Sequence, residues 1–265
     1  MEICYMSFDR EKLGKSFKKV GVSYHLGRRD YPKKLIGDVI KISGVNKDSL
    51  ILDVGCGTGK STIPFAKTGS KIVGIDISDS MLRIAKNLSV KHKNIVYKRV
   101  SFEEFISLPN SFDLILMGTA IHWLDPKMVY EKSSKLLRKG GSLALFWEPI
   151  SSLCKKIRLL GMEEMFIKNC PNYPIIPASV NYPNKRSQEV VKSKLFSSTI
   201  IKKYKFIQKY SQEEFISLIN TYSWVISLSK KDRDKLILEV KEYFVKKDYI
   251  IKFPTEIYLI IAKRK

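Results

Sequence analysis

Short apolar runs, rich in β-branched residues, alternate with stretches of helical periodicity from residue 49 onward. The runs predict strands over residues 50–54, 71–76, 94–98, 112–117 and 142–146. Between them, apolar residues that recur every three or four positions predict helices that begin near residues 60, 80 and 127. A further amphipathic helix, opened by Pro32, is expected over residues 32–42. This order of elements is typical of a parallel sheet with helices on both faces.

The regular alternation stops after Trp147. Residues 150–200 hold four prolines and no clear strand, and they are too aromatic to remain solvated, so we expect an insertion packed over the sheet. The chain then predicts a strand over 200–208, a helix opened by the capping box of Ser211 and Glu214, a helix over 230–245 and a strand over 257–262. Gly140 and Gly141 are expected to end the helix predicted over 126–137.

The charge is strongly basic, at +22 with neutral histidines, and it is spread over the whole chain. Residues 1–150 carry 25 basic and 15 acidic side chains, and the remainder carries 23 and 11, so the excess is not a basic tail. Such a field would attract acidic metabolites, RNA or an anionic membrane surface. Because no stretch gathers the five to eight basic residues of a nucleic-acid patch, we favour a solvated lysine-rich surface as the explanation of the charge.

The cysteines point to a reducing compartment. Cys4, Cys56, Cys154 and Cys170 have no close pair, so neither a zinc spacing nor a disulfide framework is present, and no metal is expected. No apolar run reaches the length that spans a bilayer, and the first 20 residues do not resemble a signal peptide. We therefore expect a cytoplasmic protein without a membrane partner, either a monomer or a homodimer.

The stretch ILDVGCGTGKST, residues 51–62, joins the first predicted strand to a helix, where open α/β sheets bind ligands. A Walker phosphate loop needs four residues between its first glycine and Gly-Lys-Ser, but only three separate Gly55 from Gly59. A dinucleotide loop needs a glycine at position 60, which is Lys60. What remains is a series of alternate glycines after Asp53, with Asp76 following 23 residues later, where a carboxylate can accept hydrogen bonds from ribose hydroxyls.

These residues resemble motif I, LDVGCGTG, of the class I S-adenosylmethionine-dependent methyltransferases. Residues 73–82, around Asp76, are similar to motif II of that family, and residues 100–104 resemble its adenine-side loop, with Ser101 where many members carry Asp. Residues 110–115 and 136–141 are similar to its fourth- and fifth-strand segments. The resemblance covers about residues 24–148. It implies a Rossmann-like class I methyltransferase fold of the α/β class, with a mostly parallel seven-stranded sheet and an inserted substrate cap.

Two segments resemble a small-molecule branch that includes trans-aconitate methyltransferase-like proteins. One is residues 118–125, with Ala120-Ile121-His122-Trp123, and the other is residues 24–32, with Arg29 where the branch has Pro. Asn220-Thr221-Tyr222-Ser223 is also similar to that branch. The Asn/Asp-Pro-Pro-aromatic motif of nucleic-acid amino-methyltransferases is absent after the fourth strand, and Cys170 lies in the wrong place for a cytosine C5 nucleophile. Cys170 is expected to be a packed apolar residue.

The resemblance implies S-adenosyl-L-methionine as cofactor and S-adenosyl-L-homocysteine as product. The glycine loop would pack against the cofactor, Asp53 would orient its amino group, Asp76 would accept its ribose hydroxyls, and Arg28 would pair with its carboxylate. The residues expected to contact it are Tyr24, Arg28, Asp53, Gly55, Cys56, Gly57, Gly59, Asp76, Ile77, Met81, Ser101, Phe102, Glu103 and Thr119. His122 and Trp123 are expected to bind the acceptor. His122 is also the candidate general base, unless it only lines the pocket.

The expected activity is methyl transfer by in-line displacement to a small acidic metabolite, with O-methylation favoured. The first alternative is an RNA-directed enzyme, such as a tRNA wobble carboxymethyluridine methyltransferase, although that family usually shows His-His in place of His122-Trp123. The second is a cofactor-binding module without activity. The expected organisation is an N-terminal helical segment closing over the cofactor (1–48), a cofactor-binding core (49–149), a substrate cap (150–200) and a C-terminal part of the core sheet with helices (201–265).

Overall fold

The computed structural model describes residues 21–174, 182–245 and 250–265, which form parts of two compact units. The first unit, here called the sheet unit, comprises Asp30–Glu148, Asn181–Tyr204 and Ile257–Lys265. The second, here called the helical unit, comprises Met1–Arg29, Pro149–Val180 and Lys205–Glu256. Residues 150–200, expected as one cap, are therefore shared between the two units. Cys4 and Pro177 lie outside the described residues.

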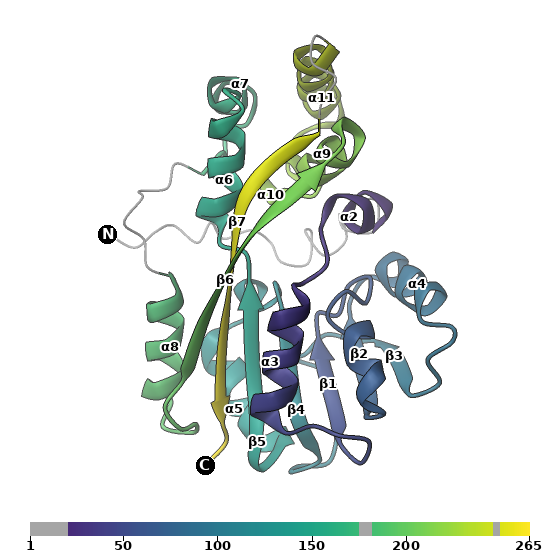
Figure 1. Ribbon diagram of the computed structural model, residues 1–265, viewed down its shortest axis with the longest axis vertical. Helices are drawn as coiled ribbons and strands as arrows, with labels where there is room; N and C mark the ends of the chain where they lie inside the picture. The colour runs from purple at the N-terminus through teal and green to yellow at the C-terminus, as the bar shows by residue number, and fades with distance from the viewer. Residues whose placement is uncertain (1–20, 175–181, 246–249) are drawn as a thin grey trace. The chain divides into compact units, whose positions relative to one another are not determined.

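A single sheet of seven strands runs in the order β3-β2-β1-β4-β5-β7-β6 (Figure 1). Its strands are β1 (Leu50–Val54), β2 (Lys71–Asp76), β3 (Ile95–Arg99), β4 (Phe112–Gly118), β5 (Leu137–Trp147), β6 (Ile200–Tyr210) and β7 (Ile251–Lys263). The strands β1 to β5 pair in parallel, and β7 pairs antiparallel with β5. This confirms the predicted α/β fold with a mostly parallel seven-stranded sheet. The boundary between the two units falls inside β6 and β7.

Both faces of the central strands are buried, which is why these strands read as continuous apolar runs. Leu52, Ile115 and Leu143 belong to one core cluster, together with Val129 and Tyr130 of α5 (Pro126–Leu136). The residues next to them along β1, β4 and β5 point to the other face and are equally buried. In Figure 1 the helix α3 (Lys33–Ser43) lies in front of the sheet and α5 lies behind it.

The described part of the sheet unit contains further helices of three to eleven residues. They are η2 (Ile63–Thr68), α4 (Asp79–Leu88), η3 (Ile121–Trp123) and α8 (Tyr182–Lys192). The prediction of a helix beginning near residue 60 was wrong, because the chain continues in turns to Thr62 and then forms only the 3₁₀ helix η2. Gly59 has a left-handed φ of 85°, and Pro64 lies in the first turn of η2. Both features stop an α-helix from starting at the glycine loop.

The prediction that Gly140 and Gly141 end a helix was also wrong. The helix α5 ends at Leu136, and both glycines lie inside β5. Gly140 has a φ of 76°, and a Cβ on Gly141 would approach carbonyl oxygens of residues 138, 112 and 113 at 2.9–3.2 Å. The register between β4 and β5 shifts here, between Phe112 and Leu114. The two glycines therefore allow an irregularity in β5, because Gly140 adopts a left-handed φ and Gly141 has no room for a side chain.

The helical unit contains α2 (Gly21–Gly27), α6 (Ile150–Leu159), α7 (Glu163–Asn169), α9 (Gln212–Ile219), α10 (Ser223–Ile226) and α11 (Lys230–Val245). The capping box predicted at Ser211 and Glu214 is present, and α11 has the predicted bounds. Phe166, Tyr173 and Phe215 belong to the core cluster of this unit. Cys170 is in the same cluster at 1% exposure, and burial raises the pKa of its thiol to about 12, so its predicted packing role is confirmed.

Candidate functional site

The carboxyl ends of β1, β2 and β4 meet at one edge of the sheet, because the three strands are parallel neighbours. The loop after β1 has left-handed φ values of 68° at Gly55, 53° at Gly57 and 85° at Gly59. A Cβ on Gly55 would lie 2.7 Å from the Cβ of Ala120, in the segment after β4, so this glycine allows close packing of the two loops. A Cβ on Gly57 would meet nothing within 4 Å. The backbone at Gly57 therefore borders open space at the sheet edge.

Asp53 lies under this loop with no solvent exposure. Its Oδ2 accepts hydrogen bonds from Ser61 Oγ at 2.7 Å and from Thr62 Oγ1 at 2.6 Å. Its Oδ1 is buried and has no hydrogen-bond partner within the described part of the chain. Burial raises the pKa of Asp53 to about 7, against the lowering effect of the two hydroxyl groups. A buried acceptor without a donor is costly, and it suits a cationic ligand group.

Asp76 ends β2 and is partly exposed. The backbone N–H of Gly57 donates to its Oδ2 at 2.9 Å, and the N–H of Ser78 donates to its Oδ1 at 2.8 Å. Burial raises the pKa of Asp76, while these N–H groups act in the opposite direction. The two bonds fix the plane of the carboxylate relative to the glycine loop. Since each carboxylate oxygen can accept a second hydrogen bond, Asp76 can still bind a pair of hydroxyl groups.

These observations fit S-adenosylmethionine, which carries an ammonium group, a ribose with two vicinal hydroxyls and an adenine. The unpartnered Oδ1 of Asp53 matches the cation, the oriented carboxylate of Asp76 matches the hydroxyls, and Gly57 leaves space for a ligand. Burial also raises the pKa of the Cys56 thiol well above its usual range. Cys56 is therefore a neutral, buried side chain, and its backbone N–H donates to the carbonyl of Ile75 at 3.0 Å while its carbonyl accepts from Gly59 at 2.9 Å.

The residues predicted on the adenine side lie around the ends of β2 and β3. Met81 and Phe102 are buried, whereas Ile77 is 45% exposed beside Asp76. Ser101 does not present a free hydroxyl, because its Oγ donates to Glu104 Oε2 at 2.9 Å and accepts from the Glu104 N–H. Glu103 is exposed, and its carbonyl accepts from Lys132 Nζ at 2.9 Å. Met81 and Phe102 therefore belong to the buried part of this edge, and Ser101 is tied into a turn.

The segment after β4 carries the residues predicted to bind the acceptor. His122 is exposed on η3 and Trp123 is partly exposed, with their ring centroids 4.8 Å apart. Thr119 has a φ of 56°, which is rare for a β-branched residue, and its Oγ1 lies 2.9 Å from the hydroxyl of Tyr31. Tyr31, Ser61 and Thr62 contact predicted site residues but were not themselves predicted. Only the position of Tyr31 beside Arg28 in the 24–32 segment could have signalled its involvement.

Tyr24 and Arg28 belong to the helical unit. Arg28 Nε donates to Thr221 Oγ1 at 2.9 Å, and its guanidinium lies 5.8 Å from the ring centre of Tyr24 and 5.4 Å from that of Tyr222. Among the described residues Arg28 has no acidic partner, whereas the next residue, Arg29, donates to Glu214 Oε1 at 2.8 Å. Arg28 is thus an oriented cation that can accept an anion. Thr221 and Tyr222 orient its guanidinium. The sequence of residues 220–223 indicated only a resemblance to the small-molecule branch and not this contact.

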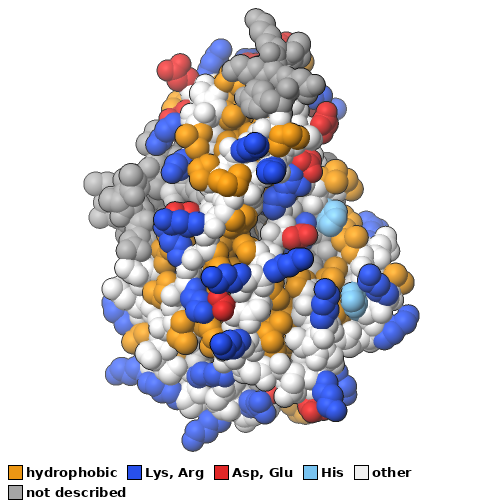
Figure 2. All heavy atoms as spheres, viewed as in Figure 1, with side chains coloured by type: hydrophobic (Ala, Val, Ile, Leu, Met, Phe, Trp, Pro, Cys, Tyr) orange, Lys and Arg blue, Asp and Glu red, His pale blue; other side chains and the backbone are white. Residues whose placement is uncertain are grey.

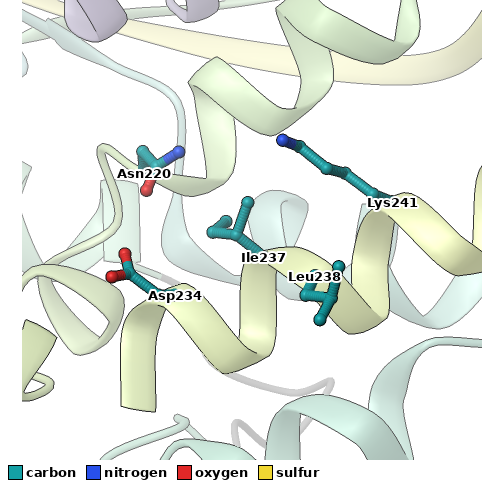
Figure 3. Close-up of a pocket in the computed structure, with 5 residues that line it drawn as sticks. All are labelled: Asn220, Asp234, Ile237, Leu238 and Lys241. Carbon is teal, nitrogen blue, oxygen red and sulfur yellow. The ribbon is translucent and has the colours of Figure 1, made fainter. Parts of the chain in front are cut away.

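A pocket in the helical unit is open to solvent (Figure 3). Its lining includes Asn220 after α9 and one side of α11, and none of the predicted site residues takes part. The residues drawn there are Asn220, Asp234, Ile237, Leu238 and Lys241. Across the described ranges, no helix is long and apolar enough to cross a bilayer, and no three acidic, histidine or cysteine side chains form a metal-binding group.

Comparisons with known proteins show that the chain is similar to methyltransferases. Residues 52–145 match the family described as a methyltransferase domain. The chain is 32% identical over 139 residues to CRG1 of Saccharomyces cerevisiae, named a probable S-adenosylmethionine-dependent methyltransferase, and covers 46% of that protein. It is 27% identical over 241 residues to an uncharacterized methyltransferase of Schizosaccharomyces pombe, with 87% of each chain covered. The chain therefore spans about half the length of the first relative and most of the second.

The fold also occurs in phosphoethanolamine N-methyltransferase 2 of Haemonchus contortus, solved with phosphomonomethylethanolamine and S-adenosylhomocysteine. The TM-score is 0.56 at 14% identity, over 97% of this chain and 59% of that one. At this identity the likeness concerns the fold, and it confirms the predicted Rossmann-like architecture. It does not identify the acceptor.

Proposed function

We propose that the chain is a class I S-adenosylmethionine-dependent methyltransferase and that it methylates the carboxylate of a small acidic metabolite. The observation that carries this proposal is the oriented, partly exposed Asp76 beside an open glycine loop, with the unpartnered Oδ1 of Asp53 below. The favoured acceptor rests on the resemblance to the trans-aconitate-like branch and on the net charge of +22. The cytoplasm, inferred from the cysteine usage, is the proposed location.

When bound, the cofactor supplies a methyl group on a sulfonium, which is an excellent leaving group. The protein then has to bind and orient the reactants and exclude water. In this proposal Asp76 accepts the ribose hydroxyls, Asp53 orients the ammonium group, and Ile77, Met81 and Phe102 flank the adenine. Arg28, stacked on Tyr24, pairs with the carboxylate of the cofactor. Orientation of this kind can supply about 7–11 kcal/mol of an activation barrier.

The acceptor side is assigned to His122 and Trp123, with residues 150–200 as the proposed source of acceptor selectivity. A carboxylate acceptor is already ionised, so its methylation needs no general base. His122 then acts by binding the acceptor through its exposed imidazole. It would act as a base only for an acceptor that arrives protonated, such as a hydroxyl or an amine.

A second candidate is methylation of RNA, which the net charge of +22 favours. The distribution of that charge argues for the metabolite. In Figure 2 the basic side chains are scattered over the visible face and interspersed with acidic ones, rather than gathered in a stripe. Several lysines are also paired within the chain, for example Lys60 with Asp30 and Lys202 with Asp38. A stripe of unpaired cations is what phosphate binding usually requires.

A methyl-transfer assay tests the proposal. A panel of acidic metabolites and bulk tRNA is incubated with the protein and S-adenosylmethionine, and the release of S-adenosylhomocysteine is measured. We expect release with a carboxylate-bearing metabolite, a weak dependence on salt, and loss of release in Asp76→Ala. In the same assay His122→Asn should raise the KM for a carboxylate acceptor and leave turnover nearly unchanged once both acceptor and cofactor are saturating. Release with tRNA that falls steeply with salt would favour RNA, and release by no acceptor would contradict the proposal.

A further inference from the structure

The turn that follows β4 holds an unusual backbone conformation beside the glycine loop. Thr119 has a φ of 56°, a value that a β-branched residue adopts only when its surroundings impose it. Its N–H donates to the carbonyl of Phe146 at 2.8 Å, and its Oγ1 shares a 2.9 Å hydrogen bond with Tyr31. Strained backbone of this kind concentrates at functional sites. We therefore ask which side chains impose this conformation on Thr119.

Tyr31 is well placed to impose this conformation. It precedes α3, and its ring packs edge-on against Phe146 with the ring centroids 4.6 Å apart. A Cβ on Gly118 would lie 2.9 Å from the hydroxyl of Tyr31 and 2.9 Å from the ring of Phe146. The tyrosine hydroxyl therefore bonds to Thr119 and leaves no room for a side chain at position 118. Its own position is fixed by an aromatic contact, so it can act as a rigid support.

The turn transmits this support to the cofactor loop on two sides. Ala120 packs against Gly55, where an added Cβ would lie only 2.7 Å away. Gly118 packs against Ser61, whose Cβ would lie 3.1 Å from an added Cβ, and Ser61 Oγ donates to Asp53. A shift of the turn would therefore move both the loop backbone and a donor to the buried carboxylate. Packed interiors transmit such shifts because they hold few voids.

We propose that Tyr31 is a positioning residue for the cofactor site. Its hydroxyl holds Thr119 in the left-handed conformation, and this sets the 118–120 turn against the glycine loop. Cofactor affinity consequently depends on a residue outside the glycine motif. The inference rests on the proposed function, since it assumes that the loop binds S-adenosylmethionine and its product. It assigns Tyr31 no contact with the cofactor and no chemical step.

Calorimetric titration with S-adenosylhomocysteine tests the proposal without a known acceptor. Tyr31→Phe removes one hydroxyl group and should weaken binding about five- to tenfold, as expected for the loss of one hydrogen bond. Thr119→Val removes the other half of the same bond and should have a similar effect. In Thr119→Gly the left-handed φ no longer needs a support. Adding Tyr31→Phe to Thr119→Gly should therefore change the affinity little, which a double-mutant cycle measures.

Tyr204→Phe is the matched control. The Tyr204 hydroxyl donates to Asp38 Oδ2 at 2.7 Å in the same unit, away from the turn, so its loss should lower the melting temperature and leave the affinity unchanged. If Tyr31→Phe behaves like this control, Tyr31 is only structural and the inference is wrong. The inference would also be overturned if Tyr31→Phe weakened S-adenosylhomocysteine binding equally in the unmodified protein and in Thr119→Gly. If the unmodified protein does not bind S-adenosylhomocysteine, the proposed function fails, and this inference fails with it.

Discussion

The glycine loop and the Arg28 cluster, which consists of Arg28 with Tyr24, Thr221 and Tyr222, differ in how far apart in the chain their interacting residues lie. In the loop, Asp53 bonds to residues only eight and nine positions away. In the helical unit, the guanidinium of Arg28 is oriented by Thr221, which is 193 positions distant. The side chain of Asp53 is thus oriented by its own segment of the chain, whereas the orientation of Arg28 depends on the fold of a whole unit. The two regions should accordingly respond differently to substitution.

The largest effect is expected at Gly57, where backbone conformation and open space coincide. Gly57→Ala keeps a left-handed φ that costs a non-glycine residue about 1–2 kcal/mol, and it also places a methyl group in the space assigned to the cofactor. The affinity for S-adenosylhomocysteine should fall about a hundredfold, which is ~3 kcal/mol. Isothermal calorimetry measures the affinity, and thermal unfolding measures the backbone cost.

Gly44 provides the matched control for this substitution. It follows α3 with a φ of 76°, and a Cβ there would also meet nothing within 4 Å. Gly44→Ala should lower stability by a similar ~1 kcal/mol and leave the affinity unchanged. Equal affinities of Gly57→Ala and Gly44→Ala for S-adenosylhomocysteine would mean that the space at Gly57 does not hold the cofactor.

A smaller effect is expected from the protonation of Asp53, whose pKa is about 7 because it is buried. Pairing with an ammonium group stabilises the ionised carboxylate, so binding below pH 7 must first release a proton. The dissociation constant of S-adenosylhomocysteine should then rise about tenfold for each pH unit below 7. Calorimetry in two buffers of different ionisation enthalpy should show the release of about one proton at pH 6.

Asp53→Asn distinguishes the protonation of Asp53 from that of other groups that titrate near pH 7, because the asparagine amide does not titrate in this range. Its affinity should be weak and nearly independent of pH. The ligand-free protein should show the opposite trend in stability. A carboxyl group whose pKa is raised on folding keeps a proton between pH 4 and 7 that the unfolded chain has lost. The free energy of unfolding should therefore fall as the pH rises through this range. A flat affinity from pH 5.5 to 8 would rule out the assignment of Asp53.

The contrast between the two regions also explains what could be read from the sequence. The strands β1 and β2 have the predicted bounds, because buried parallel strands leave an uninterrupted apolar run. The strand β7 begins six residues earlier than predicted. There, buried and exposed residues alternate and Pro254 interrupts the apolar pattern. Asp53, Gly57 and Asp76 could be identified from fixed local spacing.

The remaining parts of the site depend on contacts between distant segments. Tyr31 meets Thr119 across 88 positions, and no local signal marks either residue as a partner of the other. The left-handed φ of Thr119 is likewise invisible in a sequence, because threonine disfavours it and the residues that bond to Thr119, Tyr31 and Phe146, are distant in the chain. The helical unit includes several helices of ten residues or fewer, and the sequence of so short a helix does not reveal which distant segment it packs against. The segment that is expected to select the acceptor was therefore the least predictable.

The smallest effect is expected at Arg28, because a partly exposed cation is screened by water. Arg28→Ala should weaken S-adenosylhomocysteine about fivefold, which is ~1 kcal/mol. It should leave 5′-deoxy-5′-methylthioadenosine, which lacks the amino-acid part, unaffected. Arg29→Ala is the matched control, since it breaks the pair with Glu214 and should lower only the melting temperature. Equal weakening of both ligands by Arg28→Ala would show that the cluster supports the fold rather than a carboxylate. The Arg28 cluster would then contribute only to the stability of the helical unit, and cofactor binding would depend on the glycine loop.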